Sequence, residues 1–187
     1  MPSQHQTLKS LFEAVFWPAA AGNVFWSFCT LILDSNAAPL FPDVISRLLV
    51  LALLACYMSI EWVRNYQEFP PVVPWTFWLF DWLHVLTVVF VALAASIRPE
   101  LLFPTAFFYF AITALGHITD AWEAAETRRC DRIVLCCINL IGLVVLIVGI
   151  SQDAEHWHLP LSFMATFGLW LCFRHKQIAQ HFKRTPS

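Results

Sequence analysis

The sequence predicts an all-α integral membrane protein with six transmembrane helices in one bundle and with both termini in the cytoplasm. Three observations carry this prediction: the apolar composition, the spacing of the apolar runs and the placement of the basic residues. Of the 187 residues, 59% are hydrophobic and 13% are charged, and the mean hydropathy is +0.64. A soluble domain carries about 25% charged residues, so too few polar side chains remain here to cover a soluble surface. The net charge of −2 gives no reason to expect a nucleic-acid partner.

Six apolar runs reach, or nearly reach, the roughly 20 residues that cross a bilayer. They cover residues 10–33, 44–64, 75–97, 101–123, 132–150 and 157–173. Segments rich in proline and charge separate them, the shortest being Arg98-Pro99-Glu100. The first run has too little positive charge before it for a signal peptide, so we expect it to be retained. The last run is the shortest and contains Pro160. We predict a single polytopic domain over residues 1–187, which ends in a basic cytoplasmic tail at 174–187.

The Lys and Arg residues predict the orientation. With six spans and a cytoplasmic N-terminus, only Arg47 and Arg98 fall on the outer side. The other nine are cytoplasmic: Lys9, Arg64, Arg128, Arg129, Arg132, Arg174, Lys176, Lys183 and Arg184. This bias follows the positive-inside rule and predicts a multi-pass protein of the plasma (inner) membrane. The expected partners are the lipid bilayer and, at the basic tail, either the anionic leaflet or a cytoplasmic protein.

Ionisable residues gather at one level of the predicted bundle. They are Glu13, Glu61, Asp81, His84, His117, Asp120 and Glu123. Because alternate helices run in opposite directions, all seven lie about 3–14 Å below the cytoplasmic interface. Such groups are costly inside a bilayer, and they mark a functional site or a buried polar network. Glu13, Glu61 and Glu123 lie near enough to water to be simply hydrated.

The third and fourth runs carry paired motifs. Asp81-x-x-His84 and His117-x-x-Asp120 each place two groups on one helix face. The short link between the runs predicts an antiparallel hairpin. We expect Asp81 to lie level with Asp120, and His84 with His117. Trp78 and Trp82, one turn apart, either anchor the helix at the interface or wall a pocket beside these groups.

This set of side chains is similar to the one that helical bundles use for di-iron and di-manganese sites, where two helices supply a Glu each and two more supply a Glu-x-x-His. Here Glu13 and Glu61 would complete Asp81, His84, His117 and Asp120. Imidazole and carboxylate ligands suit a divalent metal such as Zn, Fe or Mn. The pattern differs in using Asp and in its reversed order on the fourth run. In the alternative, Asp and His hydrogen-bond one another and fix the hairpin register.

Three functions fit the sequence. The first is transport or conduction of a proton or divalent cation bound by Asp81, His84, His117, Asp120 and Glu61, with Glu13, Glu123, Trp78 and Trp82 in support. A single small protomer would make a poor pore, so this function favours a homo-oligomer. The second is a membrane-embedded enzyme, metal-dependent or not, that acts on a lipid-soluble substrate. The third is a non-catalytic sensor or scaffold that recruits a cytoplasmic partner.

Overall fold

The computed structural model describes residues 12–33, 43–68, 75–123, 126–151 and 155–184, and every one of them except Arg98 is helical. A π-helical turn, η1 (Phe12–Phe16), leads into the first long helix, and a 3-10 turn, η3 (Pro99–Leu101), joins the third to the fourth. The long helices are α2 (Trp17–Leu33), α3 (Asp43–Glu68), α4 (Trp75–Ile97), α5 (Leu102–Glu123), α6 (Glu126–Ser151) and α7 (Glu155–Arg184). The all-α prediction is confirmed for the described residues.

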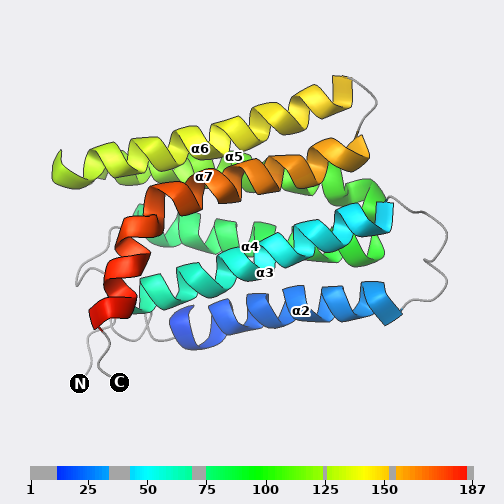
Figure 1. The fold of residues 1–187 in the computed structure, drawn as a ribbon, viewed down its shortest axis with the longest axis horizontal. Coiled ribbons are helices and arrows are strands. Elements are labelled where there is room, and N and C mark those ends of the chain that lie inside the picture. Colours follow the sequence, from blue (N-terminus) through cyan, green and yellow to red (C-terminus); the bar gives the residue numbers. More distant parts are fainter. Residues whose placement is uncertain (1–11, 34–42, 69–74, 124–125, 152–154, 185–187) are drawn as a thin grey trace.

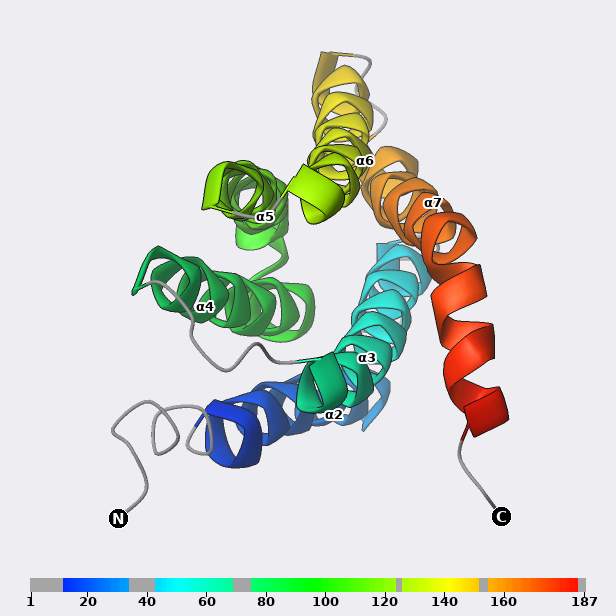
Figure 2. The same cartoon turned by 90° about the vertical axis from the view of Figure 1, so that its left-hand side faces the viewer.

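The long helices run alternately up and down a single bundle, so α2 begins and α7 ends at the same end of it (Figure 1). Each helix packs mainly against two neighbours, in the order α2, α4, α5, α6, α7, α3 and back to α2. Seen along the bundle, the helices therefore surround a shared interior (Figure 2). α4 and α5 are neighbours joined by the short turn at Arg98, which confirms the predicted hairpin.

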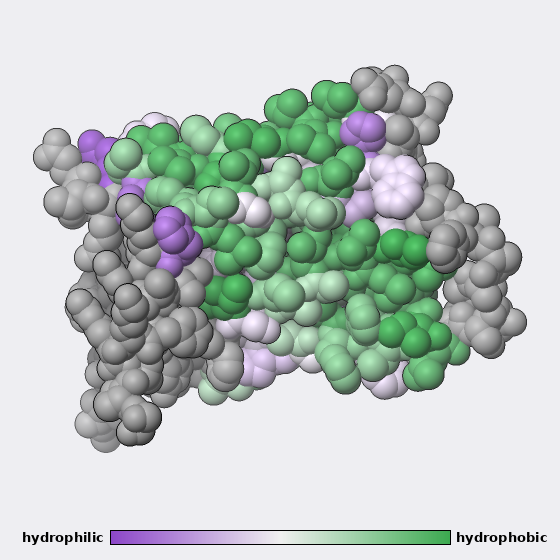
Figure 3. Space-filling model, viewed as in Figure 1, coloured by the Kyte–Doolittle hydropathy of each residue, from purple (hydrophilic) through white to green (hydrophobic). Residues whose placement is uncertain are grey.

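Five of the helices are long and apolar enough to cross a membrane. These candidate spans are Ala14–Leu33, Asp43–Glu61, Trp78–Ile97, Pro99–Trp122 and Arg129–Gly149. Large apolar side chains lie on their outer surfaces, such as Phe25 and Trp26, which are 69% and 68% exposed. Figure 3 shows green, apolar side chains over most of the described part of one face. Such a surface is suited to lipid, because a soluble monomer rarely exposes apolar patches of this extent.

As far as the described residues show, α7 is not one of these candidate spans. The run predicted at 157–173 is helical but begins with Trp157, His158 and Pro160, which shorten its apolar stretch. α7 continues into the predicted basic tail as far as Arg184. Arg174, the first residue of that tail, is 5% exposed.

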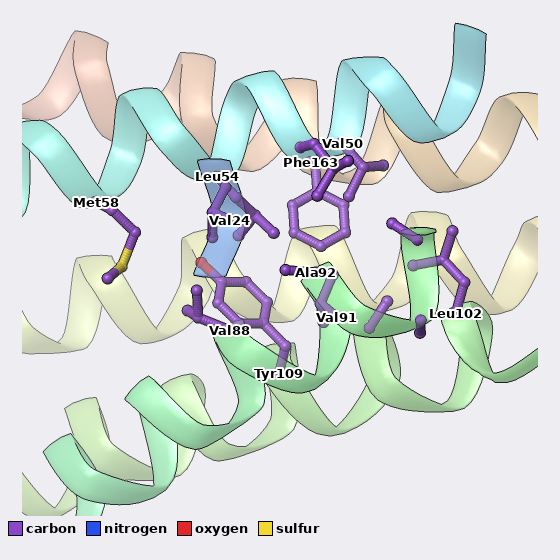
Figure 4. Close-up of a cluster of buried hydrophobic side chains, with 14 of the residues drawn as sticks. Val24, Val50, Leu54, Met58, Val88, Val91, Ala92, Leu102, Tyr109 and Phe163 are labelled. Carbon is purple, nitrogen blue, oxygen red and sulfur yellow. The ribbon is translucent and has the colours of Figure 1, made fainter. Parts of the chain in front are cut away.

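The core lies in the interior that the helices surround. Its members include Val24, Leu54, Val88, Tyr109 and Phe163, which come from five different helices and point toward one another (Figure 4). Where α5, α6 and α7 meet, Gly142 on α6 allows a close approach: an added Cβ would overlap Thr166 Oγ1 and lie 2.8 Å from Phe110 Cε1. Close contacts of this kind stabilise helix packing where lipid gives no hydrophobic drive.

At the opposite end of the bundle from the start of α2, Arg47 joins α3 to α4. Its Nε donates to the Ala95 carbonyl at 2.6 Å, and its second Nη donates to the Ser96 carbonyl at 3.2 Å. The first Nη is 3.1 Å from Asp43 Oδ2, one turn earlier on α3. Arg47 thus satisfies carbonyls in the last turn of α4, which have no partner within their own helix.

Candidate functional site

A polar cavity lies between α2, α3, α4, α5 and α6, toward the end of the bundle where α2 begins and α3 ends. It encloses about 580 Å³ of space free of atoms, part of it open to the surroundings. The side chains that line it include five of the predicted site residues, Glu61, Asp81, His84, His117 and Asp120. They also include Arg132, which the sequence did not suggest as a site residue. The fold therefore brings the predicted core of the site around one space.

His84 is the most constrained of these groups. It is 8% exposed, and its Nδ1 lies 2.8 Å from Thr113 Oγ1 on α5. The Thr113 hydroxyl donates its single proton to the Tyr109 carbonyl at 2.7 Å, so it can only accept from the imidazole. Nδ1 must then carry a proton, and in the neutral ring Nε2 carries a bare lone pair. Nε2 is buried and has no hydrogen-bond partner among the described residues.

Aromatic rings enclose this imidazole. The Tyr57 ring meets it edge-on with centroids 5.7 Å apart, and the Tyr109 ring lies 5.3 Å away. These two ring contacts and the hydrogen bond to Thr113 restrict the orientation of the imidazole. His84 is therefore a preorganised acceptor in a water-poor setting, the arrangement that strengthens polar interactions most.

The carboxylates of the cavity differ in their surroundings. Asp120 Oδ2 is 3.2 Å from Arg132 Nη1 on α6, and the two side chains are 14% and 23% exposed. Glu61 is 4% exposed, and Asp81 is half-buried. Arg132 therefore balances part of the negative charge that three carboxylates bring to the cavity.

The predicted register of the hairpin is wrong by about one helical turn. His84 bonds Thr113 instead of lying level with His117, and a Cβ added to Gly116 would lie 3.2 Å from Phe80 Cβ. The reason is the position of the turn. Residues at equal height in an antiparallel hairpin lie symmetrically about its centre, and this turn is centred near Pro99, whereas the predicted pairing required a centre closer to the start of α5. The level pairing of Asp81 with Asp120 therefore fails as well.

The described residues give no support to the predicted metal centre. No three His, Cys, Asp or Glu side chains among them converge to hold a metal ion. In the part of the chain that can be compared, Asp81, His84, His117 and Asp120 share a cavity without forming a ligand set. Glu13 lies in η1 and Glu123 ends α5, but the side chains of both are outside the described part.

The two tryptophans are placed beside the core instead of in the cavity wall. Trp78 and Trp82 pack against the buried apolar cluster, and the Trp82 ring lies 3.8 Å from the Phe16 ring, centroid to centroid. Neither lines the polar cavity or the second cavity described next. The tryptophan that does line the polar cavity is Trp17.

A second, apolar cavity adjoins the first. It lies between α3, α5, α6 and α7 and contains about 420 Å³ free of atoms, part of it open to the surroundings. Its lining is mostly aliphatic and aromatic: Leu53, Leu54, Tyr57, Tyr109, Phe110, His117, Ile138, Asn139, Phe163, Thr166, Phe167 and Trp170. Tyr57 and His117 belong to both linings, so these two side chains lie between the cavities.

Sequence reasoning missed Thr113, Arg132 and Tyr57 as members of the site. Thr113 was detectable, because it precedes His117 by one turn on the same face of α5. Arg132 was assigned to the interface as a topology signal, although it starts the apolar run of α6. Nothing in the sequence places Tyr57 beside α4, because that contact depends on how the helices close around the interior.

The fold and the cavity define the class of protein: an all-helical, membrane-type bundle with a buried polar cavity toward one end. Comparison of the chain with protein-family models, with curated proteins and with solved structures found no match.

Proposed function

We propose that this chain is a six-span membrane protein that binds and exchanges a proton at His84 and uses the polar cavity to move protons across the membrane. The observation that supports this most directly is the bare, buried Nε2 of His84 in a cavity with Glu61, Asp81 and Asp120. Intramembrane carboxylates and histidines are the usual members of proton relays.

Buried polar groups on α2 continue from the cavity toward the other end of the bundle, and they support proton movement beyond the cavity. Asn23 and Ser27 lie one turn apart on α2, about 9 and 15 Å beyond Trp17, which lines the cavity. Asn23 Oδ1 and Ser27 Oγ are buried without a hydrogen-bond partner among the described residues. Buried polar atoms of this kind are normally satisfied by ordered water. Waters at these two positions would extend a proton path along α2.

The topology is part of the same proposal. α7 runs the length of the bundle beside α3 and α6, which supports its counting as the sixth span (Figure 1). By the positive-inside rule, six spans with the basic residues on the inner side would leave both termini in the cytoplasm, and the plasma (inner) membrane is part of the proposal. Assembly into a homo-oligomer and binding of a cytoplasmic partner by the basic tail belong to the proposal as well.

The test is proton flux into proteoliposomes under an imposed pH gradient, for the wild-type protein and two histidine variants. His84→Asn keeps an N–H near the position of Nδ1 but removes Nε2, so we expect flux to fall at least tenfold. His175→Asn makes the same change at an exposed histidine of α7, and we expect wild-type flux. Wild-type liposomes no leakier to protons than empty ones would contradict the proposal, as would normal flux through His84→Asn.

The same purified protein is used to identify the transported species. We expect flux without added Zn, Fe or Mn. Elemental analysis of wild type beside a His84→Ala/His117→Ala variant tests the alternative, a bound divalent cation. One Zn, Fe or Mn per wild-type chain, lost in the double variant, would replace the proton by that metal.

A second function, an enzyme acting on a lipid-soluble substrate, is favoured by one observation. Tyr57 and His117 line both the apolar cavity and the polar one. A bound apolar molecule could thus present a polar group to an acid–base residue, which is the arrangement that general acid–base catalysis needs. This function needs a pocket but no path across the membrane.

A further inference from the structure

We propose that the polar cavity binds one ammonium ion, which donates a hydrogen bond to His84 Nε2. This inference adds a ligand to the cavity of the proton-transport proposal but does not rest on that proposal, because binding needs no path across the membrane. Three features carry it: the bare ring nitrogen, the small size of the cavity and the chemistry of its lining.

His84 requires a ligand that donates a hydrogen bond. Its Nδ1 carries the proton that Thr113 accepts, so Nε2 of the neutral ring presents a lone pair. The side chain is 8% exposed, and Nε2 has no hydrogen-bond partner among the described residues. A buried acceptor that stays unsatisfied is costly, so we expect a molecule with an N–H or O–H at this position.

The size of the cavity limits what this ligand can be. Part of the space free of atoms is open to the surroundings, and the room left for a whole molecule is that of a few waters. The wall between α4 and α5 is tight, because a Cβ added to Gly116 would lie 3.2 Å from Phe80 Cβ. The ligand is therefore about as large as water, which excludes molecules with an alkyl chain and metal ions that keep their hydration shell.

The charge of the lining favours a cation over a neutral molecule. The described part of the lining holds three carboxylates and one guanidinium, which belong to Glu61, Asp81, Asp120 and Arg132. Arg132 is paired with Asp120, so the lining as described keeps an excess of negative charge. Glu61 is 4% exposed, and water screens a buried charge of this kind weakly. An ammonium ion offsets the excess, whereas a water molecule does not.

Ammonium also suits this lining better than a metal ion does. Hard metal ions are held by a shell of oxygen ligands, and no three His, Cys, Asp or Glu side chains of the described residues converge on one point. Ammonium instead makes separate hydrogen bonds, for which a ring nitrogen and a carboxylate oxygen serve equally. Aromatic rings, whose faces attract cations, complete the lining at Trp17, Tyr57 and Phe80.

The probe is ammonium chloride, titrated calorimetrically into detergent-purified protein at constant ionic strength. We expect saturable binding of one ion per chain. K⁺ has nearly the same size and charge but no N–H, so we expect it to bind at least tenfold more weakly, as for the loss of one hydrogen bond to a charged donor. Methylammonium keeps three N–H groups but is larger than the cavity allows, and it should also bind more weakly.

The position of the ion is tested by the ¹⁵N shift of His84 Nε2 in the wild-type protein. Ammonium should move this shift, because the nitrogen gains a hydrogen bond, and K⁺ should leave it unchanged. This measurement needs no variant, so it holds even if a change at His84 prevents folding.

Two variants remove the groups that hold the ion. We expect His84→Asn and Glu61→Gln each to weaken ammonium binding at least tenfold, because the first removes Nε2 and the second removes a buried carboxylate. The matched controls are His175→Asn, at an exposed histidine of α7, and Glu100→Gln, at a side chain that is 57% exposed in η3. Both controls should bind ammonium as the wild type does.

Four results would each overturn the inference: no saturable binding of ammonium, equal affinity of the wild type for ammonium and K⁺, an Nε2 shift that ammonium does not move, or wild-type affinity in the folded His84→Asn variant. The flux assay distinguishes this failure from that of the transport proposal. Proton flux in ammonium-free buffer without ammonium binding overturns only the inference, and ammonium binding without proton flux overturns only the transport.

Discussion

Asp120 on α5 and Arg132 on α6 form an ion pair across the helix interface, with 3.2 Å between Oδ2 and Nη1. The pair explains how an arginine is accommodated at the start of an apolar run, and it occupies a carboxylate that the sequence had suggested as a metal ligand. It also joins the helix of His117 and Thr113 to α6, so it helps position the wall of the polar cavity.

We expect Asp120→Asn and Arg132→Gln each to lower the free energy of unfolding by about 3 kcal/mol, because either change leaves one partly buried charge without its partner. The double variant should lose less than the sum of the two, by about 1–2 kcal/mol. SDS titration in mixed micelles measures the free energy of unfolding of the wild type, the two single variants and the double variant. Additive losses would mean that the pair contributes nothing.

Thr113 should control the tautomer of His84. Thr113→Val removes the hydroxyl that accepts from Nδ1, so the ring is free to carry its proton on Nε2. Thr113→Ser keeps the hydroxyl and serves as the control. We expect the ¹⁵N shifts of the His84 ring to report a change of tautomer in the valine variant alone, with reduced proton flux. Unchanged shifts in Thr113→Val would contradict the hydrogen-bond assignment.

Gly142→Ala should destabilise the protein by about 1–3 kcal/mol, since the new Cβ would overlap Thr166 and crowd the Phe110 ring. Gly168 on α7 provides the control, because a Cβ there meets nothing within 4 Å. Gly168→Ala should stabilise by up to about 1 kcal/mol through helix propensity. The same unfolding titration compares them, and a neutral Gly142→Ala would disprove the close approach of α6 to its neighbours.

Arg47→Met should lower stability by about 2–3 kcal/mol, because it removes donors from two carbonyls at the end of α4. Arg98→Met is the matched change. Arg98 is 70% exposed and pairs only across a short turn with Glu100, so we expect unfolding indistinguishable from wild type. Equal losses in the two variants would show that Arg47 contributes no more than a surface pair.

The fold was predictable from the sequence to the level of its helices. Hydropathy alone located the runs that become α2 to α7. An apolar run in lipid must satisfy its backbone hydrogen bonds within the segment, so each such run is expected to be a helix. The one-sided placement of the titratable residues was predictable too, from alternating helix direction. Both inferences depend on distances along the chain, which a sequence contains.

The details of the site were not predictable in the same way. Whether His84 lies beside Thr113 or beside His117 depends on a shift of one turn, and the composition of the two helices is similar at either register. The contact of Tyr57 with His84, and the ion pair that occupies Asp120, depend on how six helices close around their interior. Pairwise patterns within one helix carry no information about that closure.

The eccentric position of the polar cavity has an electrical consequence. In the proposed membrane, a charge that reaches His84 from the nearer end of the bundle has crossed about a third of the α4 span Trp78–Ile97, whereas release to the other side must cross the remaining two thirds. The full potential amounts to about 2.3 kcal/mol per elementary charge for each 100 mV. In a proton-carrying protein, loading of His84 from the near side would therefore respond less to voltage than release does, and about two thirds of the voltage sensitivity would fall on the passage along α2.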